Sequence, residues 1–182
     1  NTAIGLGASG TGNIATFTAT NTGATAIAGT VTVTPVANTC TGSTQNFTIT
    51  VNPTPTVNTI ANQTVCNGAT TAAVSFSGAV TGTTYNWTNT NTAIGLGASG
   101  TGNIAAFTAT NTGTAAIAGT ITVTPVAATC TGTTKNFTVT VNPTPTVNTI
   151  SDQTVCNGAT TTAVKFTGAL ACTTYNWTKT DT

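Results

Sequence analysis

The chain has 182 residues, a formal net charge of +1 and no histidine, and only 3% of its residues are charged. Because capture of nucleic acid or of an acidic membrane surface needs clustered lysine and arginine, this composition excludes both kinds of electrostatic binding. A run of about 20 apolar residues is missing, so the sequence predicts no membrane insertion. Threonine is β-branched, suits half-solvated strands and is abundant, so we expect an all-β protein.

Strand signals recur along the chain and are separated by Gly, Asn and Pro. In the middle of the chain the sequence predicts strands at Thr56–Ile60, Ala72–Val80, Thr84–Thr88, Asn103–Thr110, Ala116–Val126 and Lys135–Asn142. Several of them alternate apolar and hydroxylated residues, as Phe137, Val139 and Val141 do with the threonines between them. This period of two is typical of antiparallel sheets that pack over a shared core, so the pattern predicts a β-sandwich.

The chain is also a tandem repeat with a period of 90 residues. Residues 1–90 and 91–180 differ at 17 positions, and most of the changes are mild, such as Val31 against Ile121. We refer to two residues whose numbers differ by 90 as counterparts. A unit of this length can bury a modest core of its own, so the sequence predicts successive domains and not the short rungs of a solenoid.

A Pro-Thr-Pro motif marks the expected boundary between domains. It contains Pro53 and Pro55 in one copy, and Pro143 and Pro145 in the other. Two prolines separated by one residue stiffen the backbone and remove strand donors, as a semi-rigid linker should.

The position of this motif sets the phase of the repeat. With the boundary at the prolines, residues 1–52 are the C-terminal part of one β-sandwich repeat, and 53–142 are a complete repeat. Residues 143–182 are then the N-terminal part of the next repeat. The alternative phase places repeats at 1–90 and 91–180, with the prolines in an internal loop.

Aromatic residues form the predicted core. A tryptophan on a central strand of a sandwich is usually buried, and we therefore expect Trp87 in the core. Its expected neighbours are Tyr85, Phe76, Phe107 and Phe137. Exposed tryptophan would instead provide a platform for sugars, and threonine rows such as the one at Thr120, Thr122 and Thr124 are similar to ice-binding faces. A polysaccharide- or ice-binding module is therefore an alternative.

Cysteines recur with the repeat. Cys66 and Cys156 are counterparts, as are Cys40 and Cys130. One of each per repeat in a secreted protein indicates one disulfide per domain. With the boundary at the prolines the pair is Cys66 with Cys130, and Cys40 and Cys156 pair with neighbouring repeats. The alternative phase pairs Cys40 with Cys66 and Cys130 with Cys156, and free thiols are a further interpretation.

Cys172 stands outside this pattern because its counterpart is Gly82. It is either a free thiol or part of an intermolecular bridge.

Catalytic residues are scarce. The chain has no Glu, and its two aspartates, Asp152 and Asp181, have asparagine counterparts. No repeated site can therefore hold a general base, and we expect no enzyme activity. Calcium sites need several carboxylates, and zinc sites need cysteine and histidine clusters, so the sequence predicts no metal and no cofactor.

Several motifs resemble a known family. They are Val65–Thr71, Val74–Gly78, Thr84–Thr88, Gly97–Ile104 and Phe137–Pro143. These segments are similar to the PKD-like and immunoglobulin-like repeats of very large surface proteins from gliding bacteria of the Bacteroidetes type. The resemblance implies export by the type IX route, a row of near-identical β-sandwiches outside the cell, and a role as gliding adhesin, surface fibre or spacer. The chain lacks a WDFGDG-like motif after its strand tryptophan and reads Asn86-Trp87-Thr88-Asn89 there.

Together these observations predict a non-catalytic repeat that forms the stalk or fibre of an extracellular bacterial surface adhesin. A second hypothesis follows from the phase. If each end of the chain is an incomplete sandwich, one copy can complete the next head-to-tail by strand complementation. The expected partners are neighbouring copies of the same repeat and, under the ligand-binding alternative, a surface polysaccharide.

Overall fold

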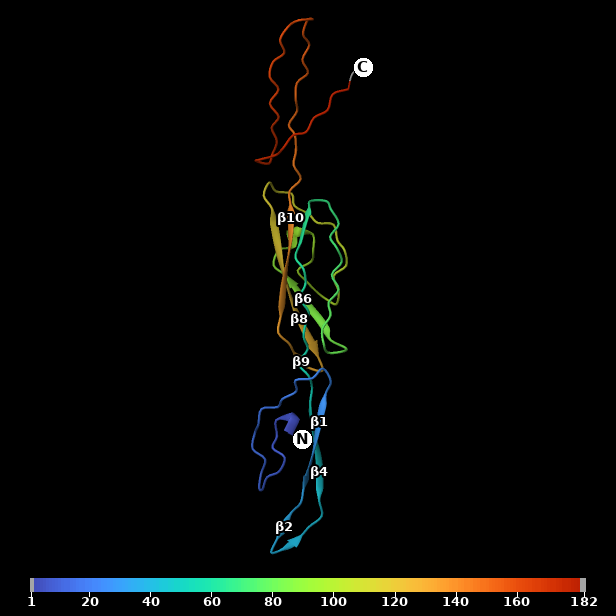
Figure 1. Cartoon of the computed structure of the whole chain (residues 1–182), viewed down its shortest axis with the longest axis vertical. Helices are drawn as coiled ribbons and strands as arrows, with labels where there is room; N and C mark the ends of the chain where they lie inside the picture. The colour runs from blue at the N-terminus through green and yellow to red at the C-terminus, as the bar shows by residue number, and fades with distance from the viewer. Residues whose placement is uncertain (1, 181–182) are drawn as a thin grey trace.

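The computed structural model describes residues 2–180, so Asn1 and the last two residues of the predicted 143–182 segment lie outside the described residues. Figure 1 shows an elongated molecule in which three parts follow one another along the long axis. We call residues 2–52 the N-terminal part, 53–142 the central part and 143–180 the C-terminal part. The all-β prediction is confirmed, because apart from two 3-10 turns the regular structure that is described consists of strands.

The central part is built on one mixed sheet. Its elements are β5 (Gln63–Cys66), β6 (Thr84–Asn89), the 3-10 turn η2 (Thr92–Ile94), β7 (Ser99–Thr101), β8 (Ile117–Ala127), β9 (Cys130–Thr131) and β10 (Lys135–Asn142). The strand order is β5-β10-β8-β6-β7, and β9 pairs with the end of β8. All these pairs are antiparallel except β5 with β10, which is parallel.

Alternation along β8 and β10 gives this sheet one buried face. In β8, Ile121 and Val123 are buried while the threonines between them are half-exposed. In β10, Phe137, Val139 and Val141 are buried in the same way. These side chains form one hydrophobic cluster drawn from residues 57–141. The period of two in the sequence therefore corresponds to the two faces of the sheet.

A second layer of extended chain covers the buried face. It contributes Val57, Val74, Phe76 and Ile104 to the cluster. The strands predicted at Thr56–Ile60, Ala72–Val80 and Asn103–Thr110 are not present as strands; isolated bridges join Val74 to Ile104 and Thr70 to Thr108 instead. Side chains take over backbone hydrogen bonds in this layer, which is why no continuous ladder forms. The backbone N–H of Phe76, for example, donates to Asn103 Oδ1 (2.9 Å).

The N-terminal part repeats one half of this arrangement. It contains the 3-10 turn η1 (Thr2–Ile4), β1 (Ile27–Val33), β2 (Val36–Ala37), β3 (Cys40–Thr41) and β4 (Gln45–Val51). Strand β1 pairs with β4 in the register Ile27 opposite Val51, which is the register of their counterparts in β8 and β10. The short β2–β3 ribbon corresponds to the pairing of β8 with β9.

The C-terminal part repeats the other half without forming strands among its described residues. Its local contacts nevertheless match those of the central part. Phe166 and Tyr175 have ring centroids 5.8 Å apart, and their counterparts Phe76 and Tyr85 are 5.7 Å apart. The side chain of Gln153 bonds both backbone groups of Thr162, as its counterpart Gln63 bonds Ala72.

The two Pro-Thr-Pro motifs differ in their surroundings. Pro53 and Pro55 are buried, whereas Pro143 is half-buried and Pro145 is exposed. A Cβ atom added to Gly132 would overlap the carbonyl oxygen of Pro55, so the backbone of this proline packs tightly against the residue that follows β9. Pro55 is therefore part of the packed structure as well as of the connection.

The two 3-10 turns are the helical elements within residues 2–180, and neither has the length or the apolar character that a membrane-spanning helix needs.

Candidate interaction surfaces at the two ends

The small sheet of the N-terminal part has two open edges. In the central part, β8 pairs with β6 on one side and β10 pairs with β5 on the other. Their counterparts β1 and β4 pair with each other, and no described strand lies on the outer edge of either. Open edges expose unpaired backbone donors and acceptors and can accept a strand from another chain.

The segments that would fill these edges have counterparts in the C-terminal part. Residues 153–156 correspond to β5 and residues 174–179 correspond to β6. Within the described chain neither segment is paired in a sheet. The C-terminal part therefore holds the counterparts of the edge strands that the N-terminal part lacks, and the N-terminal part holds the counterparts of β8 and β10 that the C-terminal part lacks.

Several apolar side chains are exposed in the end parts although their counterparts are buried in the central part. Phe47 is 45% exposed, but its counterpart Phe137 is 2% exposed. In the C-terminal part, Trp177 is 73% exposed whereas Trp87 is 9% exposed. Further exposed residues with buried counterparts are Ile14, Val33, Val147 and Val164. The two ends thus carry apolar surfaces that match the two halves of the central core.

A pair of glycines shows the fit in detail. The ring of Trp87 lies against Gly100, where an added Cβ atom would be 2.7 Å from Cε2 of the indole. Its counterpart Gly10 has open space within 4 Å of the same position. The position that the Trp87 ring occupies beside Gly100 is therefore open beside Gly10 in the N-terminal part. Gly10 was not singled out from the sequence, although comparison of the two copies could have identified it once Trp87 was placed.

An asparagine side chain makes the same hydrogen bonds in the N-terminal part as in the central part. Asn111 Nδ2 donates to the carbonyl oxygens of Ala115 and Val141, both at 2.8 Å. Its counterpart Asn21 donates to Thr25 (2.9 Å) and Val51 (2.8 Å). These asparagines could not be recognised from the sequence, because asparagine is common in this chain and the partners of these side chains are backbone groups. In the N-terminal part these bonds fix the loop that precedes β1 and tie it to the end of β4.

The aromatic residues predicted for the core lie together. Phe76, Tyr85, Trp87 and Phe137 belong to the buried cluster, and Phe107 is half-buried and packs against it. The indole Nε1 of Trp87 is buried without a hydrogen-bond partner. With its ring against Gly100, Trp87 presents no platform to a sugar. The threonines of β8 are half-exposed on the outer face of the sheet.

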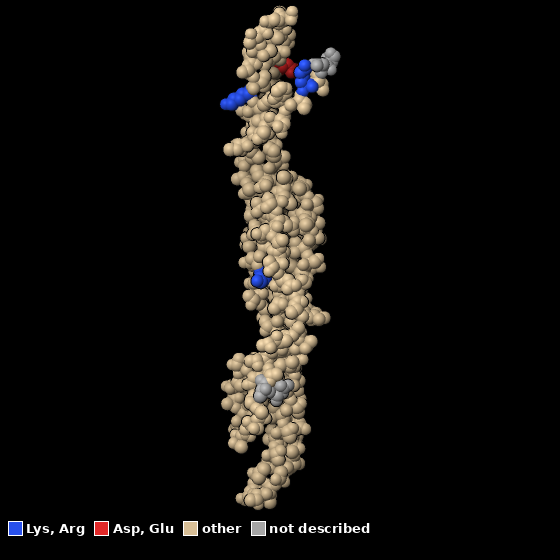
Figure 2. Space-filling model, viewed as in Figure 1, with Lys and Arg blue, Asp and Glu red and all other residues tan. Residues whose placement is uncertain are grey.

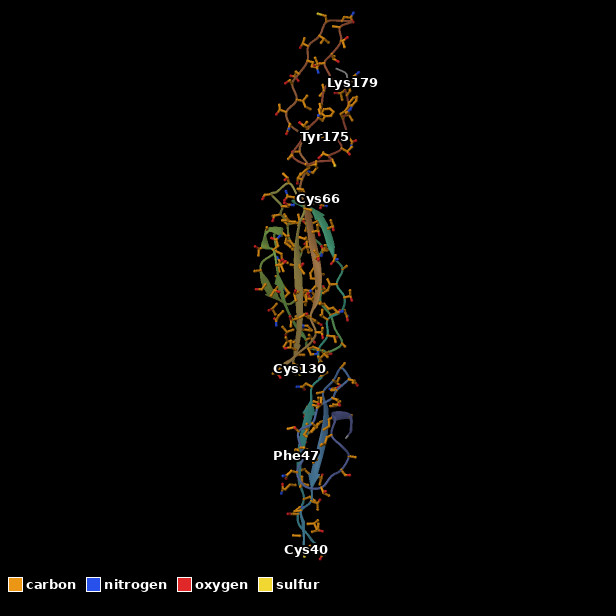
Figure 3. The ribbon with its side chains drawn as sticks, turned by 90° about the vertical axis from the view of Figure 1, so that its left-hand side faces the viewer. Cys40, Phe47, Cys66, Cys130, Tyr175 and Lys179 are labelled. Carbon is orange, nitrogen blue, oxygen red and sulfur yellow. The ribbon has the colours of Figure 1, made fainter. Side chains whose placement is uncertain are left out.

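The five cysteines are free thiols in the structure, and the predicted pairing of Cys66 with Cys130 does not occur. Cys66 lies beside Asn142, next to the level where Val141 pairs with Ile117, and Cys130 pairs with Ala127. Ile117 and Ala127 are the two ends of β8, about 34 Å apart in an antiparallel strand. Figure 3 shows Cys66 and Cys130 at opposite ends of the central part. A disulfide requires Cα atoms within about 7 Å, so the structure corrects this prediction.

The alternative pairings within the chain do not form either. Cys40 lies at the far end of the N-terminal part in Figure 3, on the opposite side of the central part from Cys66. Cys156 belongs to the C-terminal part, which in Figure 3 lies beyond Cys66, whereas Cys130 lies at the opposite end of the central part. Cys172 is exposed and has a positive φ of 57°.

Charged side chains are few, and those that the structure describes lie mainly in the C-terminal part. Figure 2 shows a surface that is almost entirely uncharged. The N-terminal part has no charged residue, and the lysines are Lys135, Lys165 and Lys179. Among the described residues, no group of three histidine, cysteine, aspartate or glutamate side chains could hold a metal ion.

A scan against models of known protein families finds no match, and a search of curated proteins finds no match either.

Proposed function

We propose that this chain is a non-catalytic structural repeat that forms the stalk or fibre of an extracellular bacterial surface adhesin. The repeat meets its neighbours only at its ends, so a fibre of this kind grows by adding copies without a change in the core. The resemblance to surface-protein repeats supports the extracellular assignment. The finer fold assignment, a tandem immunoglobulin- or PKD-like β-sandwich, belongs to the same proposal and is supported by the two layers of the central part.

The complementary open ends are the observation that carries this proposal. Residues that are buried in the central part are exposed at both ends, and each end has the half that the other lacks. A neighbouring repeat would cover them in a fibre. That repeat follows either in a longer polypeptide or in a second copy that docks head-to-tail.

Head-to-tail docking of a second copy predicts a definite register. The pairing of Trp87 with Val123 in the central part places Trp177 of one copy opposite Val33 of the next. The pairing of Cys66 with Asn142 places Cys156 of one copy opposite Asn52 of the next. Strand addition then occurs on both edges of the small sheet, antiparallel to β1 and parallel to β4.

Burial of apolar surface provides the driving force. Each large apolar side chain contributes about 1.5–3 kcal/mol when it becomes fully buried. Phe47 would enter the joint from one copy, and Trp177 and Val164 would enter from the other. The contact is heterologous, and a heterologous contact that does not close on itself produces an open filament.

The test is the self-association of the 182-residue chain, followed by analytical ultracentrifugation over a range of concentrations and by electron microscopy. We expect filaments, and we expect Trp177→Ala to weaken association by about 100-fold or more, as loss of a buried interface tryptophan does. Lys165→Ser is the matched control, because Lys165 and its counterpart Ser75 are both exposed. A chain that stays monomeric at all concentrations would contradict the head-to-tail form of the proposal.

A further inference from the structure

Cys66 lies at the end of the central part that faces the next repeat. It is the last residue of β5 and is the Cα partner of Asn142, the last residue of β10. Val65 packs against the core and Cys66 is exposed, so the thiol lies on the outer face of the sheet. The neighbouring residue Asn67 already contacts the following repeat, where its Nδ2 donates to Thr144 Oγ1 (3.2 Å).

Cys130 lies at the end of the central part that faces the preceding repeat. It begins β9 and is the Cα partner of the buried residue Ala127, so its side chain is on the inner side of the sheet. The thiol is half-buried. The chain reverses here through Ala128 and Thr129, both with positive φ, and this turn projects toward the N-terminal part.

The joint between the N-terminal and central parts shows how two repeats meet. Asn52 Nδ2 donates to the carbonyl oxygen of Ala128 (3.3 Å), which is two residues before Cys130. A pocket of about 300 Å³ lies at this joint and is lined by Asn52 of the N-terminal part and by Pro53, Ala127 and Ala128 of the central part. Asn52 is the counterpart of Asn142, which pairs with Cys66 at the end of β5. A counterpart of β5 added to the edge of β4 would therefore place its last residue, a cysteine, beside Asn52.

The relative orientation of successive sheets decides whether a counterpart of Cys66 beside Asn52 would lie on the same side of the molecule as the Cys130 thiol. In Figure 1 the covering segments of the N-terminal part lie to the left of β1 and β4, while those of the central part lie mainly to the right of β8 and β10. The sheets therefore face opposite ways. The outer face of one sheet therefore lies on the same side of the molecule as the inner face of the next, so a counterpart of Cys66 added beside Asn52 would lie on the side of the Cys130 thiol.

We propose that disulfides between adjacent repeats lock each joint, with Cys156 of one copy bonded to Cys130 of the next and Cys66 of the first bonded to Cys40 of the second. This inference rests on the proposed function, because it requires head-to-tail contact between copies. Each joint then carries two covalent links, which explains why the cysteines recur with the repeat although they lie too far apart to pair within it.

The chemistry is thiol–disulfide exchange with an external disulfide, either a small molecule such as oxidised glutathione or an oxidoreductase. Two thiols of adjacent copies lose two protons and two electrons and form one S–S bond. The external disulfide gains them and is reduced to two thiols. Such bonds persist in the oxidising environment outside the cell.

Peptide mapping tests this pairing directly. Equal amounts of isotopically heavy and light chain are assembled under reducing conditions, oxidised with oxidised glutathione, alkylated and digested with chymotrypsin without reduction. Cleavage after the aromatic residues leaves one cysteine in each of the fragments 18–47, 48–76, 108–137, 138–166 and 167–175. We expect 138–166 linked to 108–137 and 48–76 linked to 18–47, with heavy–light hybrids in both cases. A link from 48–76 to 167–175, which contains Cys172, would overturn the inference.

Variants separate this inference from the proposed function. The double variant Cys66→Ser, Cys130→Ser removes one thiol from each pair. We expect it to form filaments in the electron microscope but to run as a single 17.8 kDa chain in denaturant without reducing agent. Each single variant retains one link per joint and stays polymeric under the same conditions. Cys172→Gly, which restores the residue of the other copy, is the control and behaves as the parent chain.

The possible failures are distinct. Filaments whose five thiols are all alkylated after oxidation would overturn the disulfides and leave the fibre proposal standing. A chain that forms no assembly in either redox state would overturn the head-to-tail joint and the disulfides with it.

Discussion

The central part and the two end parts carry nearly the same residues in two different states. Asn21 and Asn111 make the same local hydrogen bonds, and the Phe166–Tyr175 ring pair matches Phe76–Tyr85. The mixed sheet and the buried cluster, by contrast, exist only where both halves of a repeat are present. Turns and side-chain caps are therefore specified locally in this protein, whereas strand pairing and burial require the other half.

The largest expected effect is a contrast between two phenylalanines. Phe137→Ala should lower the free energy of unfolding of the central part by about 3–5 kcal/mol, because it removes a fully buried ring and leaves a cavity. Phe47→Ala changes an exposed counterpart and should alter the same quantity by less than about 0.5 kcal/mol. Urea unfolding of dilute chain, followed by Trp87 fluorescence in a Trp177→Phe background, measures both. Equal effects of the two variants would mean that Phe47 is buried in the single chain.

The same contrast explains how much of the fold the sequence could predict. The period-two segments at Thr84–Thr88, Ala116–Val126 and Lys135–Asn142 correspond to β6, β8 and β10, because alternation reports directly on the two faces of a sheet. The expected strand at Ala72–Val80 failed for a different reason. Its backbone groups bond to side chains such as Asn103, and composition gives no sign of that exchange.

The cysteine pairing shows a second limit. Spacing along the chain suggested Cys66 with Cys130, since each repeat holds one of each. The distance between them depends on the parallel pairing of β5 with β10, which places Cys66 at the finishing end of β10. Strand order and direction are not visible in the alternation of residues. The open-edge surfaces were expected from the phase of the repeat, but Gly10 and Asn21 became recognisable only through their counterparts.

A next, smaller effect is expected at the glycine beneath the tryptophan. Gly100→Val places a branched side chain against the Trp87 ring and should destabilise the central part by about 3 kcal/mol through overpacking. Gly10→Val enters open space and should leave the unfolding of the dilute chain unchanged. It should nevertheless prevent assembly, because Trp177 of a second copy needs that space. If the Gly10→Val variant formed filaments at the same concentration as the unchanged chain, Trp177 of a second copy would not bind beside Gly10.

Hydrogen-bonded asparagines should give a more modest difference. Asn111→Ala leaves the buried carbonyl oxygen of Val141 without its amide donor and should lower stability by about 1–2 kcal/mol. Asn21→Ala removes the same bonds in a less buried loop and should have less than half this effect on the dilute chain. Amide hydrogen exchange at Gly113 and Gly23, whose backbone N–H groups donate to these side chains, reports on each loop separately. Unchanged protection in both variants would show that the caps do not hold the loops.

The smallest expected effect is that of salt. Raising sodium chloride from about 0.05 to about 0.5 M should change the stability of the central part by less than about 0.5 kcal/mol, since its lysine, Lys135, is exposed on a nearly uncharged surface. The association of copies at the head-to-tail joint should be equally insensitive to the salt concentration. The N-terminal part contributes no charged side chain to the joint, so no ion pair between side chains can form across it. Sedimentation of the assembled chain at both salt concentrations measures this. A steep loss of assembly with salt would contradict this expectation, and the joint between copies would then differ from the central part in its electrostatics as well as in its burial.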